Sequence, residues 1–153
     1  MKKIVLLIIS ALLISGCATT PKANSLFSAE DINFAEEMIP HHEQAVTMSE
    51  FAFKNTTNSD VIALATAIRD AQGPEITQMQ SWLDESNYSG THAGHMEMGG
   101  MLTDVELAEL ASLKDAAFDQ MFLTSMIAHH EGALDMVSMI KNSTNSEVKK
   151  LYE

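Results

Sequence analysis

Cysteine and basic residues are scarce in this sequence, and each scarcity excludes a class of protein. The 153 residues include 1 Cys, so an intramolecular disulfide is impossible. Lys and Arg together number 9 against 21 Asp and Glu, which gives a net charge of −12. A chain of this charge is repelled by phosphate backbones and anionic lipid head groups, so we expect neither nucleic-acid binding nor electrostatic adsorption to membranes. Aromatic residues make up only 6%, and the length suits one domain.

The first residues have the composition of an export signal. Lys2 and Lys3 precede an apolar run over 4–14, which is shorter than the roughly 20 residues a membrane span requires. The segment LISGC, which ends at Cys17, resembles the lipobox of bacterial lipoproteins, in which the cysteine is diacylated and becomes the N-terminus. We therefore expect a membrane-anchored lipoprotein facing the periplasm or the cell exterior, and Ala18 favours the outer membrane. The predicted parts are a signal peptide over 1–16, a tether over 17–27 and a domain over 28–153.

The rest of the chain has the pattern of helices. Apolar residues recur at spacings of three and four, which is the helical period, and strand patterns are scarce. Ser28 and Thr103 each begin a capping box, the motif that opens many helices. We expect Pro40 and Pro74 to kink or break their helices, because proline removes a backbone donor. The expected helices cover about 28–54, 60–85, 103–113, 115–141 and 147–153, with a loop over 87–102.

The chain contains an internal repeat. The sequence MIPHHEQA at 38–45 corresponds to MIAHHEGA at 126–133, and a near copy of the same polar turn follows each. Two helical hairpins of similar sequence predict an all-α fold, an antiparallel four-helix bundle. The second copy ends early, so the last helix is truncated and the counterpart of 67–83 is missing. We expect a partner chain to complete the bundle, with a homodimer as one candidate, or else the reading frame to be truncated.

Histidine and methionine form the most distinctive pattern. There are 6 His, all in close pairs, and 11 Met. On a helix, His41 and His42 lie on either side of the apolar stripe, and the second copy repeats this arrangement. Methionines at helical spacing usually fill a core, but two adjacent imidazoles carry a desolvation cost that one hydrogen bond does not offset. We therefore predict a shared metal site inside the bundle. Its candidate ligands are Met38, His41, His42, Met48, Met126, His129, His130 and Met136.

The predicted loop is a second candidate for metal binding. It contains the sequence HAGHMEMGGM at 92–101, whose glycines make a backbone that can wrap an ion. The alternative is an ordinary linker, but a linker gains nothing from three closely spaced methionines, which are open to oxidation. We expect a metal-collecting loop. Its candidate ligands are His92, His95, Met96, Met98 and Met101.

The softness of these ligands indicates which metal they bind. Thioether and imidazole without thiolate favour Cu(I) and, by the same argument, Ag(I). Zn(II) prefers histidine with cysteine or carboxylate. Cu(II) is a further candidate, held by the imidazoles together with Glu43 or Glu131.

Three motifs together resemble the domain-of-unknown-function 305 family. They are the doubled Met-Ile-x-His-His-Glu motif, the sequence EITQMQSWL at 75–83 and the sequence GHMEMGGM at 94–101, and the similarity covers about 30–153. The resemblance implies an exported, ferritin-like four-helix bundle, often encoded with copper-handling genes. CopM-type members bind copper or silver outside the cytoplasm and support metal tolerance. The resemblance also adds Met79 to the ligands, and metal ions and copper-handling proteins to the expected partners.

The leading functional hypothesis is a non-enzymatic copper(I)/silver(I)-binding protein for sequestration, transfer or tolerance. A ferritin-like metal-dependent oxidase is one alternative. Di-iron sites in such bundles use Glu-x-x-His motifs, whereas Glu43 and Glu131 directly follow a histidine here. A non-catalytic helical interaction module is the other alternative. Nothing resembles a nucleophile with its base.

Overall fold

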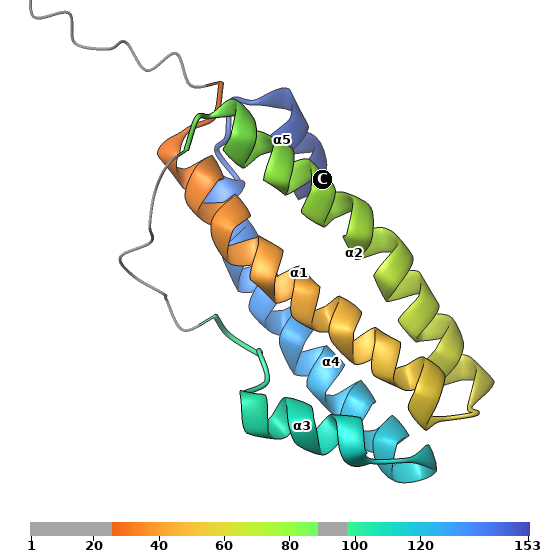
Figure 1. Cartoon of the computed structure of the whole chain (residues 1–153). Helices are drawn as coiled ribbons and strands as arrows, with labels where there is room; N and C mark the ends of the chain where they lie inside the picture. Colours follow the sequence, from red (N-terminus) through yellow and green to blue (C-terminus); the bar gives the residue numbers. More distant parts are fainter. Residues whose placement is uncertain (1–25, 89–97) are drawn as a thin grey trace, which may run out of the picture.

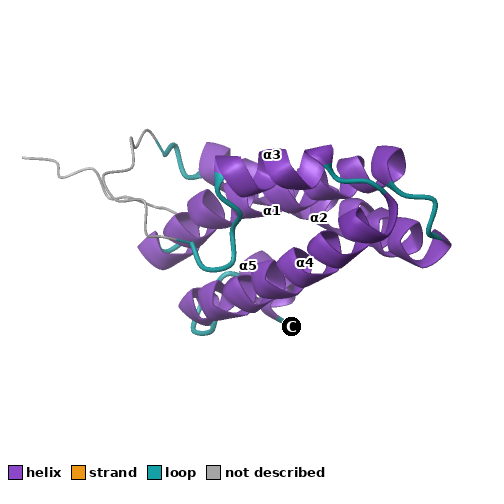
Figure 2. Cartoon of the chain, turned by 90° about the horizontal axis from the view of Figure 1, so that it is seen from below, coloured by secondary structure: helices purple, strands orange, loops and turns teal. Residues whose placement is uncertain are grey.

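The computed structural model describes residues 26–88 and 98–153. All regular elements in these two ranges are helices (Figure 2). In the same ranges, no helix combines the length and the apolar character needed to cross a bilayer. The elements are α1 (Ala29–Asn55), α2 (Ser59–Glu85), α3 (Asp104–Ser112), α4 (Asp115–Val137), the 3₁₀ turn η1 (Ser138–Ile140) and α5 (Ser146–Tyr152).

Local sequence signals account for most helix starts. The Ser28 hydroxyl accepts a hydrogen bond from the Asp31 backbone amide at 3.1 Å, and the Asp31 carboxylate accepts one from the Ser28 amide at 2.9 Å. Thr103 begins α3 with the same capping box, as predicted. α1 and α2 continue through Pro40 and Pro74, so of the kinks or breaks that we expected, the breaks are wrong. Packing along a 27-residue helix outweighs the loss of one backbone hydrogen bond.

The helices form an all-α bundle, which confirms the predicted fold class. α1 runs antiparallel to α2 and to α4, and α3 crosses one end of the bundle (Figure 1). α5 has only 7 residues and lies beside the last turns of α2, at the opposite end. The second hairpin, α4 and α5, therefore repeats the first hairpin with a much shorter second helix.

The hydrophobic core is divided into two clusters along the bundle. The Trp82 cluster lies at the α5 end, and the Phe118 cluster lies at the α3 end. Phe27, which we expected in the tether, is 5% exposed and lies with its ring centroid 5.7 Å from that of Trp82. Phe27 is therefore part of the folded core. The Trp82 cluster is Phe27, Ile32, Phe34, Ala35, Met38, Met79, Trp82, Met136, Ile140 and Val148; the Phe118 cluster is Ala45, Met48, Ala52, Val61, Ala65, Ile68, Leu110, Phe118, Phe122 and Met126.

Candidate metal centre

A layer of histidines interrupts the core between the two clusters. On α1 the buried apolar residues stop at Met38 and resume at Ala45, with the buried His41 and His42 between them. His129 occupies the matching position on α4. The rings of His41 on α1 and His129 on α4 are in contact, with centroids 3.7 Å apart and planes tilted by 38°. The repeat has therefore brought one imidazole from each copy into direct contact.

The second histidine of α1 is held by a carboxylate on α2. His42 Nε2 donates to Glu75 Oε2 at 2.8 Å. The His42 side chain is 10% exposed, whereas the Glu75 side chain is 38% exposed, so the carboxylate connects the layer to the surface. Because the carboxylate accepts at Nε2, Nδ1 is the nitrogen that carries the lone pair in the neutral form of the ring. A carboxylate that orients an imidazole in this way is a common outer partner in metal sites.

The end of the loop covers His41 from the other side. His41 Nε2 lies 3.4 Å from the Gly99 carbonyl oxygen, which can only accept, so this contact also favours a proton on Nε2. A side chain fastens the loop to α1: Gln44 donates to the Leu102 carbonyl at 2.8 Å and accepts from the Leu102 amide at 2.7 Å. Specific contacts thus hold residues 99–102, the end of the loop, beside His41.

Glycines let the loop backbone approach α4 closely. A Cβ added to Gly132 would lie 1.8 Å from the Gly99 carbonyl oxygen, and one added to Gly100 would lie 2.0 Å from the Ala128 carbonyl oxygen. Gly100 also has a φ of +78°, which L side chains rarely adopt. Any side chain at these positions would push the loop away from the histidine layer.

The buried histidines keep nitrogens without partners. Nδ1 of His41, Nδ1 of His42 and both ring nitrogens of His129 are buried without a hydrogen bond from any residue that the structure describes. Burial lowers the pKa of His41 to about 4, and the nearby His42 and His130 lower it further, against an opposing effect of the Gly99 carbonyl. Burial lowers the pKa of His129 to about 3, with added repulsion from His41, His130 and His42. A contact with the His41 backbone opposes this shift, but its geometry does not qualify as a hydrogen bond. Both rings are therefore neutral at pH 7, the form that binds metals.

The candidate methionines flank the layer. Those on the helices are all at least nine-tenths buried and lie in one or the other cluster. Met98 and Met101, the described candidates of the loop, are half-buried. Met98 lines a hollow of about 330 Å³ together with Met136 and Met139, and the carboxyl residues Glu37 and Asp135 lie at the same hollow. In the Trp82 cluster are Met38, Met79 and Met136; in the Phe118 cluster are Met48 and Met126.

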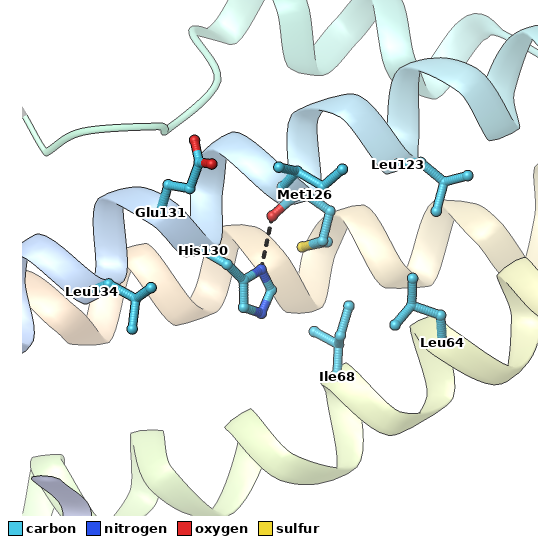
Figure 3. A pocket seen from close by; sticks show the side chains of 8 residues that line it. Leu64, Ile68, Leu123, Met126, His130, Glu131 and Leu134 are labelled. Carbon is cyan, nitrogen blue, oxygen red and sulfur yellow. Dashed lines mark hydrogen bonds between the residues drawn. The ribbon is translucent and has the colours of Figure 1, made fainter.

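One predicted ligand is oriented differently from our expectation. His130 is exposed, not turned toward the interior, and its Nδ1 donates to the Met126 carbonyl of its own helix at 2.8 Å (Figure 3). Within 26–88 and 98–153, no three His, Cys, Asp or Glu residues are grouped so as to hold a metal ion. The predicted sites Cys17, His92, His95 and Met96 lie outside the described residues.

Sequence reasoning missed the residues that hold the layer in place. These are Glu75, Gln44, Gly132 and Gly100, together with the third methionine of the hollow, Met139. A signal for two of them was present in the repeat. MIPHHEQA and MIAHHEGA differ at Gln44 and Gly132, which occupy equivalent positions and both contact the loop.

Comparisons with known proteins agree with this fold. The family model for DUF305, a domain of unknown function, matches residues 31–153. A DUF305 protein from Streptomyces coelicolor, described as secreted, is 29% identical, with a TM-score of 0.75 and 80% of each chain covered. CopM is 31% identical in its Cu(I)-bound form (TM-score 0.65; 80% of this chain and 81% of CopM) and in its Cu(II)-bound form (TM-score 0.63; 80% and 82%). The uncharacterized protein L153 of Acanthamoeba polyphaga mimivirus is 41% identical over 56 residues, which span 37% of its length.

Proposed function

The chain belongs to the DUF305 family, and we propose that it binds Cu(I) or Ag(I) outside the cytoplasm, for sequestration, transfer or tolerance. The observation that carries this proposal is the set of buried, unpartnered ring nitrogens of His41, His42 and His129. A buried polar atom without a partner is costly, and a bound metal ion removes that cost. The Cu(I)-bound and Cu(II)-bound structures of CopM, which is 31% identical, support the choice of metal.

The chemistry of the layer suits a soft monovalent ion. Neutral imidazoles and thioethers are its potential ligands, and no thiolate is present among the described residues. Cu(I) accepts two or three such ligands without a carboxylate. Cu(II) favours additional oxygen ligands, for which Glu75 is better placed than the exposed Glu43 and Glu131.

The hollow lined by Met98, Met136 and Met139 provides a second set of soft ligands. It shares Gly99 with the contact to His41, so it adjoins the histidine layer. Its carboxylates raise the local concentration of cations. We propose that an ion enters through this hollow and passes to the histidines.

The place of action follows from the N-terminal sequence. We propose that residues 1–16 direct export, that Cys17 carries a lipid anchor, and that 17–27 forms the tether apart from its last residue, Phe27. The similarity to a DUF305 protein described as secreted supports export. Copper-handling proteins and a second copy of this chain remain predicted partners.

The alternative of a ferritin-like oxidase has less support. Such an enzyme needs several carboxylates inside the bundle. Glu43 and Glu131, which follow the histidine pairs, are both exposed, and in the described residues only Glu75 contacts the layer. The site therefore resembles a binding site more than a redox centre.

The test is a titration of the metal-free, full-length protein with Cu(I) in competition with a chromophoric Cu(I) chelator. We expect stoichiometric transfer of Cu(I) to the protein. His41→Leu and His129→Leu should each weaken binding at least about tenfold, because even outer partners of metal ligands are worth 10–100-fold. Ser49→Ala, a buried polar change in the Phe118 part of α1, is the matched control. Absence of transfer to the wild-type protein, or unchanged affinity in both histidine variants, would refute the proposal.

A further inference from the structure

A polar hollow lies where the start of α1 meets the turn between η1 and α5. It has a volume of about 290 Å³, and apart from Met139 every residue that lines it is polar. The two segments supply carboxylate, hydroxyl and amide oxygens, and hard cations prefer oxygen ligands. The polar lining residues are Ser28, Glu30 and Asp31 from the start of α1, and Asn142, Ser143 and Thr144 from the turn.

One carboxylate oxygen of this lining is buried without a partner. Asp31 is 1% exposed, and its Oδ2 accepts a hydrogen bond from the Ser28 amide at 2.9 Å. Its Oδ1 makes no hydrogen bond to any residue that the structure describes. Capping of α1 therefore accounts for Oδ2 but not for Oδ1. A buried carboxylate oxygen without a partner is costly, and a cation bound to it removes that cost.

The internal repeat contains a second copy of this turn, and that copy holds a positive charge. The sequence KNSTNS at 141–146 is a near copy of KNTTNS at 54–59, which joins α1 to α2. At this first turn, Lys114 Nζ donates to Asn55 Oδ1 and, at 3.5 Å, to the Lys54 carbonyl. Asn58 of the same turn donates to Asp119 at 2.8 Å. Asp119 lies 88 residues after Asp31, the offset that also relates His129 to His41.

The turn beside Asp31 lacks the ammonium group. With the same offset of 88, the equivalent of Lys114 is Leu26, which is 71% exposed. Asn145, the equivalent of Asn58, donates to the Leu26 carbonyl at 3.1 Å and not to Asp31. Oδ1 of Asp119 is also buried without a hydrogen bond from the described residues, but Lys114 supplies positive charge at that turn. The hollow beside Asp31 therefore corresponds to a place where the other repeat uses a cation.

We propose that this hollow binds a Ca²⁺ ion. Asp31 Oδ1 is its buried carboxylate ligand, Glu30 is the second carboxylate, and neutral oxygens of residues 142–144 and water complete the set. Ca²⁺ takes about six to eight oxygen ligands in irregular geometry, whereas Mg²⁺ requires a near-ideal octahedron. The bound ion ties the start of the first repeat to the turn of the second.

The composition of the site sets its affinity. It has two carboxylate residues, so it is not one of the groups of three acidic or histidine ligands typical of tight sites. We expect a dissociation constant of about 10⁻⁴–10⁻³ M, the range of extracellular Ca²⁺ modules. The net charge of −12 raises the local concentration of cations. The site uses oxygen and not nitrogen or sulfur, so it does not depend on copper binding at the histidine layer.

The test is thermal unfolding of the metal-free, full-length protein with Ca²⁺ or Mg²⁺ at constant ionic strength, which removes general screening. At about 10 mM, Ca²⁺ should raise the Tm by about 5 °C, and Mg²⁺ by less than half as much. Asp31→Asn should abolish the rise with Ca²⁺. Asp119→Asn, at the equivalent position of the other repeat, is the matched control and should keep it. Glu30→Gln, at an exposed residue, should increase the Ca²⁺ concentration needed for half the rise several-fold.

Three results would overturn the proposal. They are no saturable rise of the Tm in the wild type, an equal rise in Asp31→Asn, and an equal rise with Mg²⁺ and Ca²⁺, which would mean that divalent ions act on the net charge alone. Circular dichroism before heating verifies that each variant is folded. If Asp31→Asn does not fold, Glu30→Gln decides, and an unchanged Ca²⁺ dependence in that variant would refute the site.

Discussion

Acidification should unfold the metal-free protein far earlier than its carboxylates alone would require. The cause is the pair of buried histidines, His41 and His129, whose folded-state pKa values are about 4 and about 3. In the unfolded chain both titrate near 6.5. Because the native state binds fewer protons than the unfolded chain between these values, their contribution to stability is complete above about pH 6.5 and is lost as the pH falls toward 4.

The size of the effect follows from the two pKa differences. At pH 5 the unfolded chain holds a proton on nearly every such histidine, whereas the folded protein holds almost none. This costs about 2 kcal/mol for each of His41 and His129, or about 4 kcal/mol together. A typical domain is stable by only about 5–15 kcal/mol, so a fall from pH 7 to pH 5 removes a large part of the total.

The assay is urea unfolding of the metal-free protein at pH 7 and at pH 5. The free energy of unfolding should fall by about 4 kcal/mol in the wild type, and by about half as much in His129→Leu. Met121→Leu, a change at a half-buried residue beside the Phe118 cluster, should keep the full pH dependence. A free energy that does not change between the two pH values, or that changes equally in His129→Leu, would show that the histidines are not buried in the neutral form.

Two further substitutions test the surroundings of the layer. Gly132→Ala should destabilise the protein by about 1–3 kcal/mol in thermal unfolding, because its Cβ would overlap the Gly99 carbonyl. Gly73→Ala, at a position with open space in α2, is the control and should be neutral or stabilising by up to about 1 kcal/mol. Equal effects of the two substitutions would contradict the close packing at Gly132. Met139→Leu should slow Ag(I) uptake in stopped-flow measurements several-fold, whereas Met121→Leu should not. Identical uptake rates would remove the hollow from the entry route.

The sequence predicted the fold because local and repeated signals agreed. The capping boxes at Ser28 and Thr103 and the helical spacing of apolar residues are encoded within a few residues, and all appear in the structure. The contact of His41 with His129 followed from the repeat, since duplicated hairpins place equivalent residues together. The exposure of His130 did not follow, because the helical pattern of α4 does not show which of its faces other helices cover.

The two repeats differ where their surroundings differ, and this explains the asymmetry of the layer. Gln44 and Gly132 occupy equivalent positions but act differently. The Gln44 side chain hydrogen-bonds to the loop, whereas Gly132 lets the loop backbone approach because it has no side chain. The end of the loop therefore contacts α1 and α4 at the same height along the bundle, next to the histidines. There it offers its Gly99 carbonyl to His41 alone. Neither ring nitrogen of His129 makes a hydrogen bond to a described residue. Of the two equivalent histidines, His41 is therefore oriented by the protein, whereas His129 needs a bound ligand to satisfy its nitrogens.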